Sequence, residues 1–313
     1  DEPSSNLDEA SIAVLQKMLP MLKERGIALL IAEHRLHYLT ALMDRLIILE
    51  EGKIDREFSR EAFLALSEDA LADMGLRSRE KPVLRLPAWK NEGELTVENL
   101  CCPFRRGEEL ELSQASFSFG KIYGIVGENG CGKSTLLRAM TGLEAPKKSR
   151  ITLRGKALSG RERIARSALV MQDVNSQLFA DSVEEELRLA WKGRGLREKA
   201  AEEEIQRAIE NLLHALGLAE CKERHPMSLS GGQKQRLALA TCLLQDANFF
   251  YFDEPTSGMD RKNMLRIAAL LKQQQREDRI LFVVSHDTAF LQEVATECLD
   301  LETFRKRTAV SRK

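Results

Sequence analysis

The chain has 313 residues, of which 43% are hydrophobic and 30% are charged, and its 47 basic and 48 acidic residues leave a net charge of -1. This composition is typical of a folded globular protein with room for two domains. The balanced charge argues against nucleic acid as the main partner. The longest apolar runs, such as Ile280–Val284, are far shorter than the roughly 20 residues that a membrane span needs, so we expect any membrane association to be made through a partner protein.

The first eight residues, DEPSSNLD, recur as DEPTSGMD at residues 253–260, and the match extends to His34 and His286. We interpret this as an internal repeat whose first copy lacks its front part. Residues 1–80 are therefore expected to be the C-terminal part of a first domain, and the chain a fragment of a longer tandem protein. Residue periodicity in this copy predicts a helix at about 9–25, a strand at 27–32, a helix at 34–43 and a strand at 45–49.

Residues 81–93 are predicted to be a linker, because the stretch around them is charged, contains two prolines and shows no period. A second and complete domain is expected at 94–302, followed by a tail at 303–313. Phe104 lies near the start of this domain, where an aromatic ring could stack on a nucleobase. An ordinary edge-strand aromatic is an equally good interpretation of Phe104.

Residues 124–137, GIVGENGCGKSTLL, match the phosphate-binding pattern G-x-x-x-x-G-K-[ST], with an apolar strand before the loop and a helical pattern after it. In such a loop, glycines let successive N–H groups converge on phosphate oxygens, and the positive end of the new helix points at the same charge. Lys133 would neutralise the β- and γ-phosphates, and Ser134 would ligate Mg²⁺. The predicted nucleoside triphosphate site consists of Gly127, Glu128, Asn129, Gly130, Cys131, Gly132, Lys133, Ser134 and Thr135.

The six cysteines show no C-x-x-C pair and no zinc-binding spacing, and we interpret them as reduced thiols. Cys131 lies inside the phosphate-binding loop, where the N–H groups and Lys133 would favour a thiolate. The alternative is that Cys131 is simply a small residue that fits the loop.

Two segments after the loop carry polar groups suited to a nucleotide. Gln172 ends a strand-like segment, where it could touch Mg²⁺ and the attacking water. Residues 229–233, LSGGQ, open a helix and expose N–H groups to an anion. Taken alone, this second segment is explained equally well as an ordinary capped helix.

Two apolar strands predicted at 249–252 and 280–284 end in residues with acid-base chemistry. Asp253 and Glu254 follow the first strand, where one carboxylate suits Mg²⁺ and the next suits a base for water. His286 follows the second strand.

In their order and spacing these segments resemble the ATP-binding-cassette (ABC) ATPases. The motifs that match this family are Walker A at Gly127 to Ser134, the Q-loop at Gln172, the signature LSGGQ at Leu229 to Gln233, Walker B at Phe249 to Asp253, the catalytic glutamate at Glu254, the D-loop at Ser257 to Asp260 and the switch histidine at His286. Residues 1–56 resemble the last part of the same family, with Asp1, Glu2, Asp8 and His34 in the corresponding places. Two small departures are the D-loop sequence SGMD and Phe104 in place of the usual tyrosine.

The resemblance implies an α/β P-loop NTPase fold, with a RecA-like core, an antiparallel β subdomain and a helical subdomain. It implies one complete ABC domain after the C-terminal part of another, with ATP and Mg²⁺ as cofactors and ATP hydrolysis coupled to transport. The implied roles are catalysis by Glu254, His286 and Gln172, metal binding by Ser134, Gln172 and Asp253, and contact with an opposing domain's nucleotide by Ser230, Gly231, Gly232 and Gln233.

Two further details resemble the energy-coupling-factor group, which powers uptake of vitamins and metal ions and includes cobalt-type importers. They are QLF with SVEEE within residues 177–186, and AEHR at 32–35 with DRLIIL at 44–49. The implied partners are transmembrane transporter subunits and a second ABC domain, from a full-length first half or from another chain. The implied location is the cytoplasmic face of the cell membrane. The alternatives are a soluble tandem ABC translation or ribosome factor, and an inactive scaffold module; the short linker and the D-loops SNLD and SGMD argue against the first.

Overall fold

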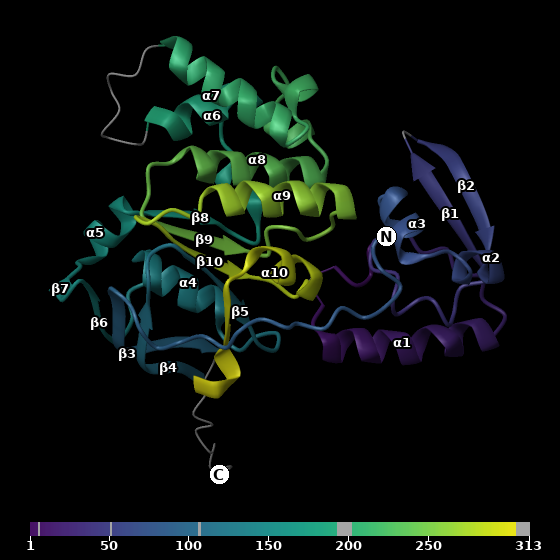
Figure 1. The fold of residues 1–313 in the computed structure, drawn as a ribbon, viewed down its shortest axis with the longest axis horizontal. Coiled ribbons are helices and arrows are strands. Elements are labelled where there is room, and N and C mark those ends of the chain that lie inside the picture. Colours follow the sequence, from purple (N-terminus) through teal and green to yellow (C-terminus); the bar gives the residue numbers. More distant parts are fainter. Residues whose placement is uncertain (6, 51, 106–107, 193–201, 305–313) are drawn as a thin grey trace. The chain divides into compact units, whose positions relative to one another are not determined.

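A computed structural model describes residues 1–5, 7–50, 52–105, 108–192 and 202–304 of the chain (Figure 1). The chain divides into two compact units. The smaller unit contains Asp1–Val83 with Gly258–Met264, and the larger unit contains Leu84–Ser257 with Leu265–Lys313. Each unit is described separately below.

The larger unit is built on a five-stranded sheet in which every strand pair is parallel and the order is β11-β5-β10-β9-β8. Its strands are β5 (Lys121–Val126), β8 (Ser167–Val170), β9 (Phe249–Asp253), β10 (Ile280–Val284) and β11 (Glu297–Asp300). Every residue of β9 and β10 is buried. Continuous apolar runs of this kind are expected where helices cover both faces of a parallel sheet.

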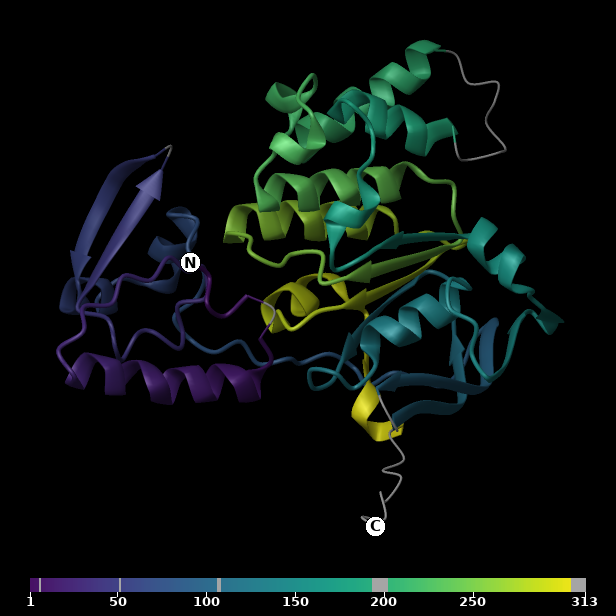
Figure 2. The ribbon, with the colours of Figure 1, turned by 180° about the vertical axis from the view of Figure 1, so that it is seen from behind.

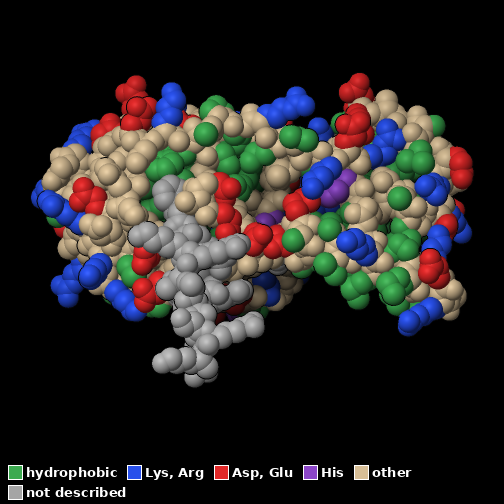
Figure 3. All heavy atoms as spheres, turned by 90° about the horizontal axis from the view of Figure 1, so that it is seen from below, with side chains coloured by type: hydrophobic (Ala, Val, Ile, Leu, Met, Phe, Trp, Pro, Cys, Tyr) green, Lys and Arg blue, Asp and Glu red, His purple; other side chains and the backbone are tan. Residues whose placement is uncertain are grey.

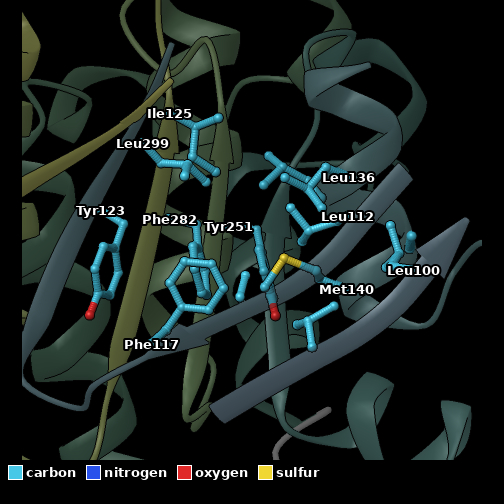
Figure 4. Close-up of a cluster of buried hydrophobic side chains, with 14 of the residues drawn as sticks. Leu100, Leu112, Phe117, Tyr123, Ile125, Leu136, Met140, Tyr251, Phe282 and Leu299 are labelled. Carbon is cyan, nitrogen blue, oxygen red and sulfur yellow. The ribbon is translucent and has the colours of Figure 1, made fainter. Parts of the chain in front are cut away.

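A second, antiparallel sheet in the order β4-β3-β6-β7 packs against the first through the main hydrophobic core. Its strands are β3 (Leu95–Arg105), β4 (Glu108–Phe117), β6 (Lys148–Leu153) and β7 (Lys156–Ala157). At the centre of the core, shown in Figure 4, the ring of Phe117 meets the edge of Phe282 at 4.9 Å, and Tyr251 stacks on Phe282 at 5.0 Å. These contacts join one strand of the antiparallel sheet to two strands of the parallel sheet.

The helices of the larger unit surround these sheets. They are α4 (Lys133–Thr141), α5 (Gly160–Ala165), α6 (Val183–Lys192), α7 (Glu202–Ala215), α8 (Gly231–Leu244), the part of α9 (Arg261–Gln273) from Leu265 onward and α10 (Thr288–Val294), with the short 3-10 helices η1 (Val174–Gln177), η2 (Ala219–Cys221), η3 (Pro226–Ser228) and η4 (Leu301–Phe304). In both ribbon views α6 and α7 lie on the side of α8 that faces away from the sheet (Figures 1 and 2). The predicted α/β P-loop fold with an antiparallel β subdomain is therefore confirmed.

Most of the predicted linker is bonded to the larger unit. The Cys298 N–H donates to the carbonyl of Pro87 at 2.9 Å, and the Trp89 N–H donates to the carbonyl of Cys298 at 2.8 Å, so this stretch continues the sheet beside β11. The indole of Trp89 packs 5.8 Å from Phe117 and donates to the Ser116 carbonyl at 3.0 Å. These contacts involve mainly the backbone and one aromatic ring, and they leave no periodic pattern in the sequence. The domain limits at residues 80 and 94 stay predictions.

The smaller unit contains α1 (Glu9–Glu24), the antiparallel hairpin of β1 (Arg45–Glu50) and β2 (Lys53–Ser59), α2 (Arg60–Leu64) and α3 (Glu68–Asp73). Helix α1 begins where Asp8 accepts the N–H of Ser11 at 2.8 Å, a standard N-cap. Its apolar face packs on Tyr38 and Leu39. The helix and the strand predicted at 9–25 and 45–49 are confirmed.

Two predictions for the smaller unit are wrong. Residues 27–32 are not a strand and residues 34–43 are not a helix, since 37–42 form turns. In the larger unit, β10 is flanked by β5 and β9, whereas among the described residues no strand pairs with 27–32, where Leu30 is 94% exposed. An apolar run becomes a parallel strand only where neighbours supply its backbone hydrogen bonds. The stretch 36–42 instead places Leu36 and Leu39 in two separate buried clusters.

Lys and Arg side chains are interspersed with Asp and Glu side chains on the face of the molecule shown in Figure 3. Within the described residues, no helix has the length and the apolar character needed to cross a membrane.

Candidate nucleotide-binding and catalytic site

The phosphate-binding loop connects β5 to α4 at the carboxyl edge of the parallel sheet. Gly132 caps α4 in a left-handed conformation, with φ of 102°, and no side chain caps the helix start. The N–H groups at this end of α4 are therefore not satisfied by a capping side chain, which suits an anion. Gly127 also has a positive φ, and a Cβ added there would lie 2.7 Å from the sulfur of Cys131.

Lys133 lies across the loop from which it arises. Its side chain is buried, and its ammonium donates to the carbonyls of Gly127 at 2.8 Å and Glu128 at 2.9 Å. A cation is thus held against the backbone of the loop, where a phosphate oxygen would be attracted.

Cys131 is buried in the loop, and burial raises the pKa of its thiol, although the charge of Lys133 opposes this rise. This contradicts the thiolate hypothesis and agrees with the alternative, in which Cys131 is a small residue that fills the loop. Glu302, beyond β11, also reaches this region and accepts the Glu128 N–H at 3.4 Å. Nothing in the sequence near Glu302 pointed to the loop.

The first metal-ligand candidates, Ser134 and Asp253, meet at the edge of the sheet. Ser134 lies in the first turn of α4 and Asp253 at the end of β9, and their side chains share a hydrogen bond. Burial raises the pKa of Asp253, while the bond from Ser134 and the charge of Lys133 lower it. A hydroxyl and a carboxylate supply the oxygen ligands that Mg²⁺ prefers.

Glu254 and His286 come together beyond the ends of the adjacent strands β9 and β10. The backbone N–H of His286 donates to Oε1 of Glu254 at 2.9 Å, and the hydroxyl of Ser285 donates to Oε2 at 3.2 Å. Glu254 has a φ of 52°, and its own N–H donates to the carbonyl of Val284 at 2.9 Å. A non-glycine residue in this left-handed conformation is held there by its surroundings, as is common in active sites.

Two residues that hold Glu254 in place were not predicted from the sequence. Ser285 binds its carboxylate, and the buried side chain of Gln235 donates to its carbonyl at 3.1 Å. Ser285 precedes His286, and Gln235 follows the LSGGQ segment closely. Their positions beside these two motifs could have marked them as candidate site residues.

The remaining predicted site residues lie on surrounding elements. Gln172 lies just beyond β8, where it is exposed. Ser230 caps α8 and exchanges hydrogen bonds with Gln233 at 3.3 and 2.9 Å, forming a capping box. The ordinary-cap interpretation of LSGGQ is thus correct for the local geometry, and it leaves Ser230 and Gly231 exposed at a helix start. The side chain of Phe104 lies outside the described part of the chain.

The phosphate-binding loop between β5 and α4, the carboxylates beyond β9 and the antiparallel sheet define the larger unit as a P-loop NTPase with the ABC ATPase fold. Comparison with known proteins agrees, because residues 110–257 match the ABC transporter family. The larger unit therefore has the fold of an ABC ATPase, and most of it matches the ABC transporter family.

Three similar proteins extend this comparison. A Treponema denticola protein, provisionally named an ABC transporter ATP-binding protein, is 37% identical over 310 residues, covering 96% of this chain and 61% of that protein. A Bacillus subtilis protein, provisionally named the HMP/thiamine import ATP-binding protein YkoD, is 28% identical over 336 residues, covering 96% of this chain and 59% of that protein. The structure of cbiO1 from Clostridium perfringens, described as part of the ABC transporter complex cbiONQ, is 29% identical with a TM-score of 0.51, covering 62% of this chain and 79% of that one. The chain thus spans less than two thirds of the length of the two sequence relatives.

Proposed function

We propose that this chain belongs to the ATP-hydrolysing subunit of an ABC importer of the energy-coupling-factor type, which takes up a vitamin or a metal ion. The observation that carries the proposal is the Glu254 carboxylate, which accepts hydrogen bonds from His286 and Ser285. It follows directly on the buried Asp253, which pairs with Ser134, in a domain that matches the ABC transporter family. Import is supported by the name of the Bacillus subtilis relative and by the transporter complex of the Clostridium perfringens structure.

The loop residues would bind the nucleotide. Lys133 and the N–H groups of residues 127–135 would hold the β- and γ-phosphates, and the Phe104 ring would stack on the base. Ser134, Asp253 and Gln172 would hold Mg²⁺, which when bound neutralises charge on the phosphate oxygens.

Hydrolysis would transfer the γ-phosphoryl group of ATP to water. Glu254 would orient the water and accept its proton as the oxygen attacks phosphorus and the bond to ADP breaks. The N–H of His286 fixes the Glu254 carboxylate, which lowers the entropy lost on reaching the transition state. The His286 ring would contact the γ-phosphate.

A complete site would need a second ABC domain. Ser230, Gly231, Gly232 and Gln233 would contact the γ-phosphate of a nucleotide on the opposing domain through the exposed start of α8. Closure of two such domains around ATP would drive transmembrane subunits, which would keep the protein at the cytoplasmic face of the membrane.

We also propose that residues 1–80 are the C-terminal part of a first ABC domain. The N–H of Glu2 donates to the carbonyl of Ala32 at 2.8 Å, as the N–H of Glu254 donates to that of Val284 at 2.9 Å. Glu2 also shares a positive φ, 40° against 52° for Glu254. The repeat in sequence is thus accompanied by a repeat in backbone geometry.

The test has two parts. The purified chain should bind ATP and release phosphate in a Mg²⁺-dependent reaction, and Lys133→Ala should weaken binding. A tagged form of the full-length parent protein should sediment with membranes and enrich integral membrane subunits. If the chain does not bind ATP, the proposed ATPase activity is wrong. If the full-length protein sediments with ribosomes, the translation-factor alternative is favoured.

A further inference from the structure

Gln235 is a polar side chain in a helix whose other buried residues are mainly apolar. It lies at the start of the second turn of α8 and is 7% exposed, while Leu237 and Leu239 on the same helix are fully buried. Burial of an amide costs free energy unless the amide finds hydrogen-bond partners inside the protein. Nε2 of Gln235 donates to the backbone carbonyl of Glu254 at 3.1 Å. The buried amide is therefore used on the residue proposed to activate water.

The backbone of Glu254 is held on both of its sides. Its N–H donates to the carbonyl of Val284 at 2.9 Å. Its carbonyl accepts Nε2 of Gln235 and also the N–H of Ser257, which lies at 3.3 Å. Between these bonds Glu254 has a φ of 52°, a conformation that is unfavourable for a residue with a Cβ and persists only where its surroundings impose it. Loss of the bond from Gln235 would let Glu254 relax toward a negative φ.

The direction of the Glu254 carboxylate depends on this backbone conformation, because a change of φ turns the side chain about the chain axis. In the observed conformation the carboxylate accepts the hydroxyl of Ser285 at 3.2 Å and the N–H of His286 at 2.9 Å. A relaxed backbone would swing the carboxylate away from both donors. Gln235 can thus act on the carboxylate through the backbone.

We infer that Gln235 is a positioning residue for hydrolysis, which keeps Glu254 in the backbone conformation that directs its carboxylate to the attacking water. The inference rests on the proposed function, in which Glu254 accepts the proton of that water. A base must lie within hydrogen-bond reach of its proton, and displacement of a catalytic group by 1 Å can cost about 10²-fold in rate. The helix that begins at LSGGQ therefore also holds the glutamate of its own domain.

The first experiment removes the donor and keeps the length of the side chain. In Gln235→Met the maximal ATPase rate should fall at least about tenfold. The dissociation constant for ATP should change less than about threefold, because the phosphate-binding loop is untouched. The matched control is Leu239→Met, a buried substitution one turn further along α8, which should keep most of the rate.

A Gln235→Met variant with the wild-type rate overturns the inference, and so does an equal loss of rate in Leu239→Met. A wild-type chain that does not hydrolyse ATP instead overturns the proposed function, so the two failures are distinguishable.

The second experiment tests whether Gln235 acts through Glu254 or through the LSGGQ segment, which ends two residues before it. A double-mutant cycle with Glu254→Gln separates the two routes. In the Glu254→Gln background, Gln235→Met should change the residual single-turnover rate less than about twofold, because the carboxylate that Gln235 positions is already absent. An equal fold loss in both backgrounds contradicts the assigned role.

A third variant keeps the inference testable if Gln235→Met does not fold. Gln235→Glu preserves the shape of the side chain, and burial raises the pKa of such a carboxyl group. The protonated group can donate to the Glu254 carbonyl, whereas the ionised group cannot. The rate of this variant relative to the wild type should therefore fall as the pH rises from about 6 to about 9. A ratio that stays constant or rises over this range contradicts the role of Gln235 as a donor.

Discussion

Nε2 of His286 lies 3.8 Å from Oε1 of Glu254, and the same oxygen accepts the backbone N–H of His286 at 2.9 Å. One residue therefore presents both its ring and its backbone to the oxygen proposed to activate water. The two groups come from the ends of neighbouring parallel strands, β9 and β10, so their approach depends on strand register.

Replacement of this carboxylate should separate binding from turnover. Glu254→Gln keeps an oxygen that can accept the His286 N–H but removes the proton acceptor, so the rate should fall by about 10²- to 10⁴-fold. ATP affinity should stay close to that of the wild type. Phosphate release and fluorescent-nucleotide titration measure the two quantities, with Glu277→Gln, on the loop before β10, as a charge-matched control. A Glu254→Gln chain with wild-type turnover would remove Glu254 from the proposed mechanism.

Cys131 should be unreactive in the folded protein. Burial raises its thiol pKa, so the thiolate fraction at pH 7.5 is smaller than for an ordinary cysteine and increases only as the pH rises. Iodoacetamide labelling followed by mass spectrometry of the loop peptide should be slow at pH 7.5 and fast after denaturation. Rapid native labelling at that pH would instead support the thiolate hypothesis.

The features of the site that depend on residues close together in the chain could be predicted from the sequence. The loop at 127–134 and the strands β9 and β10 follow from glycine spacing and continuous apolar runs, which act within a few residues. Gln235 and Ser285 could not be assigned in the same way, because their contacts with Glu254 arise only when α8 and β10 pack beside β9. The same limit explains the wrong strand at 27–32, where the apolar pattern is present but no strand among the described residues pairs with it.

The loop before α6 is a candidate docking surface for the proposed membrane subunit. Phe179 is 78% exposed, and its N–H and that of Ala180 donate to the buried carboxylate of Glu186, which fixes the loop. Glu185 is exposed, whereas Glu184 is bonded to Arg188 and Lys222. Phe179 and Glu185 are therefore the residues free to meet a partner surface.

Phe179→Ser and Glu185→Lys should reduce transport by the assembled transporter while sparing basal ATPase activity. Glu184→Lys serves as the contrasting variant, because it breaks the contacts with Arg188 and Lys222 and should lower thermal stability instead. Uptake in membrane vesicles, ATPase rate and melting temperature separate these effects. Normal uptake by both surface variants would place the contact elsewhere on the protein.

The last prediction concerns how a complete ATP site forms. The sequence contains one G-x-x-x-x-G-K-S loop, at 127–134, and one LSGGQ segment, at 229–233, and both belong to the larger unit. If each ATP is held between the loop of one domain and LSGGQ of another, two chains must meet head to tail in an isologous contact that supplies both signatures. ATPase activity of this 313-residue chain should then rise more than linearly with protein concentration, because the active species is a dimer. Lys133→Ala and Ser230→Arg chains should each be inactive, since one lacks phosphate binding and the other blocks the partner's nucleotide. Mixing them should restore activity, because the mixed dimer contains one intact site. Activity proportional to concentration, together with a mixture no more active than its components, would contradict the composite site.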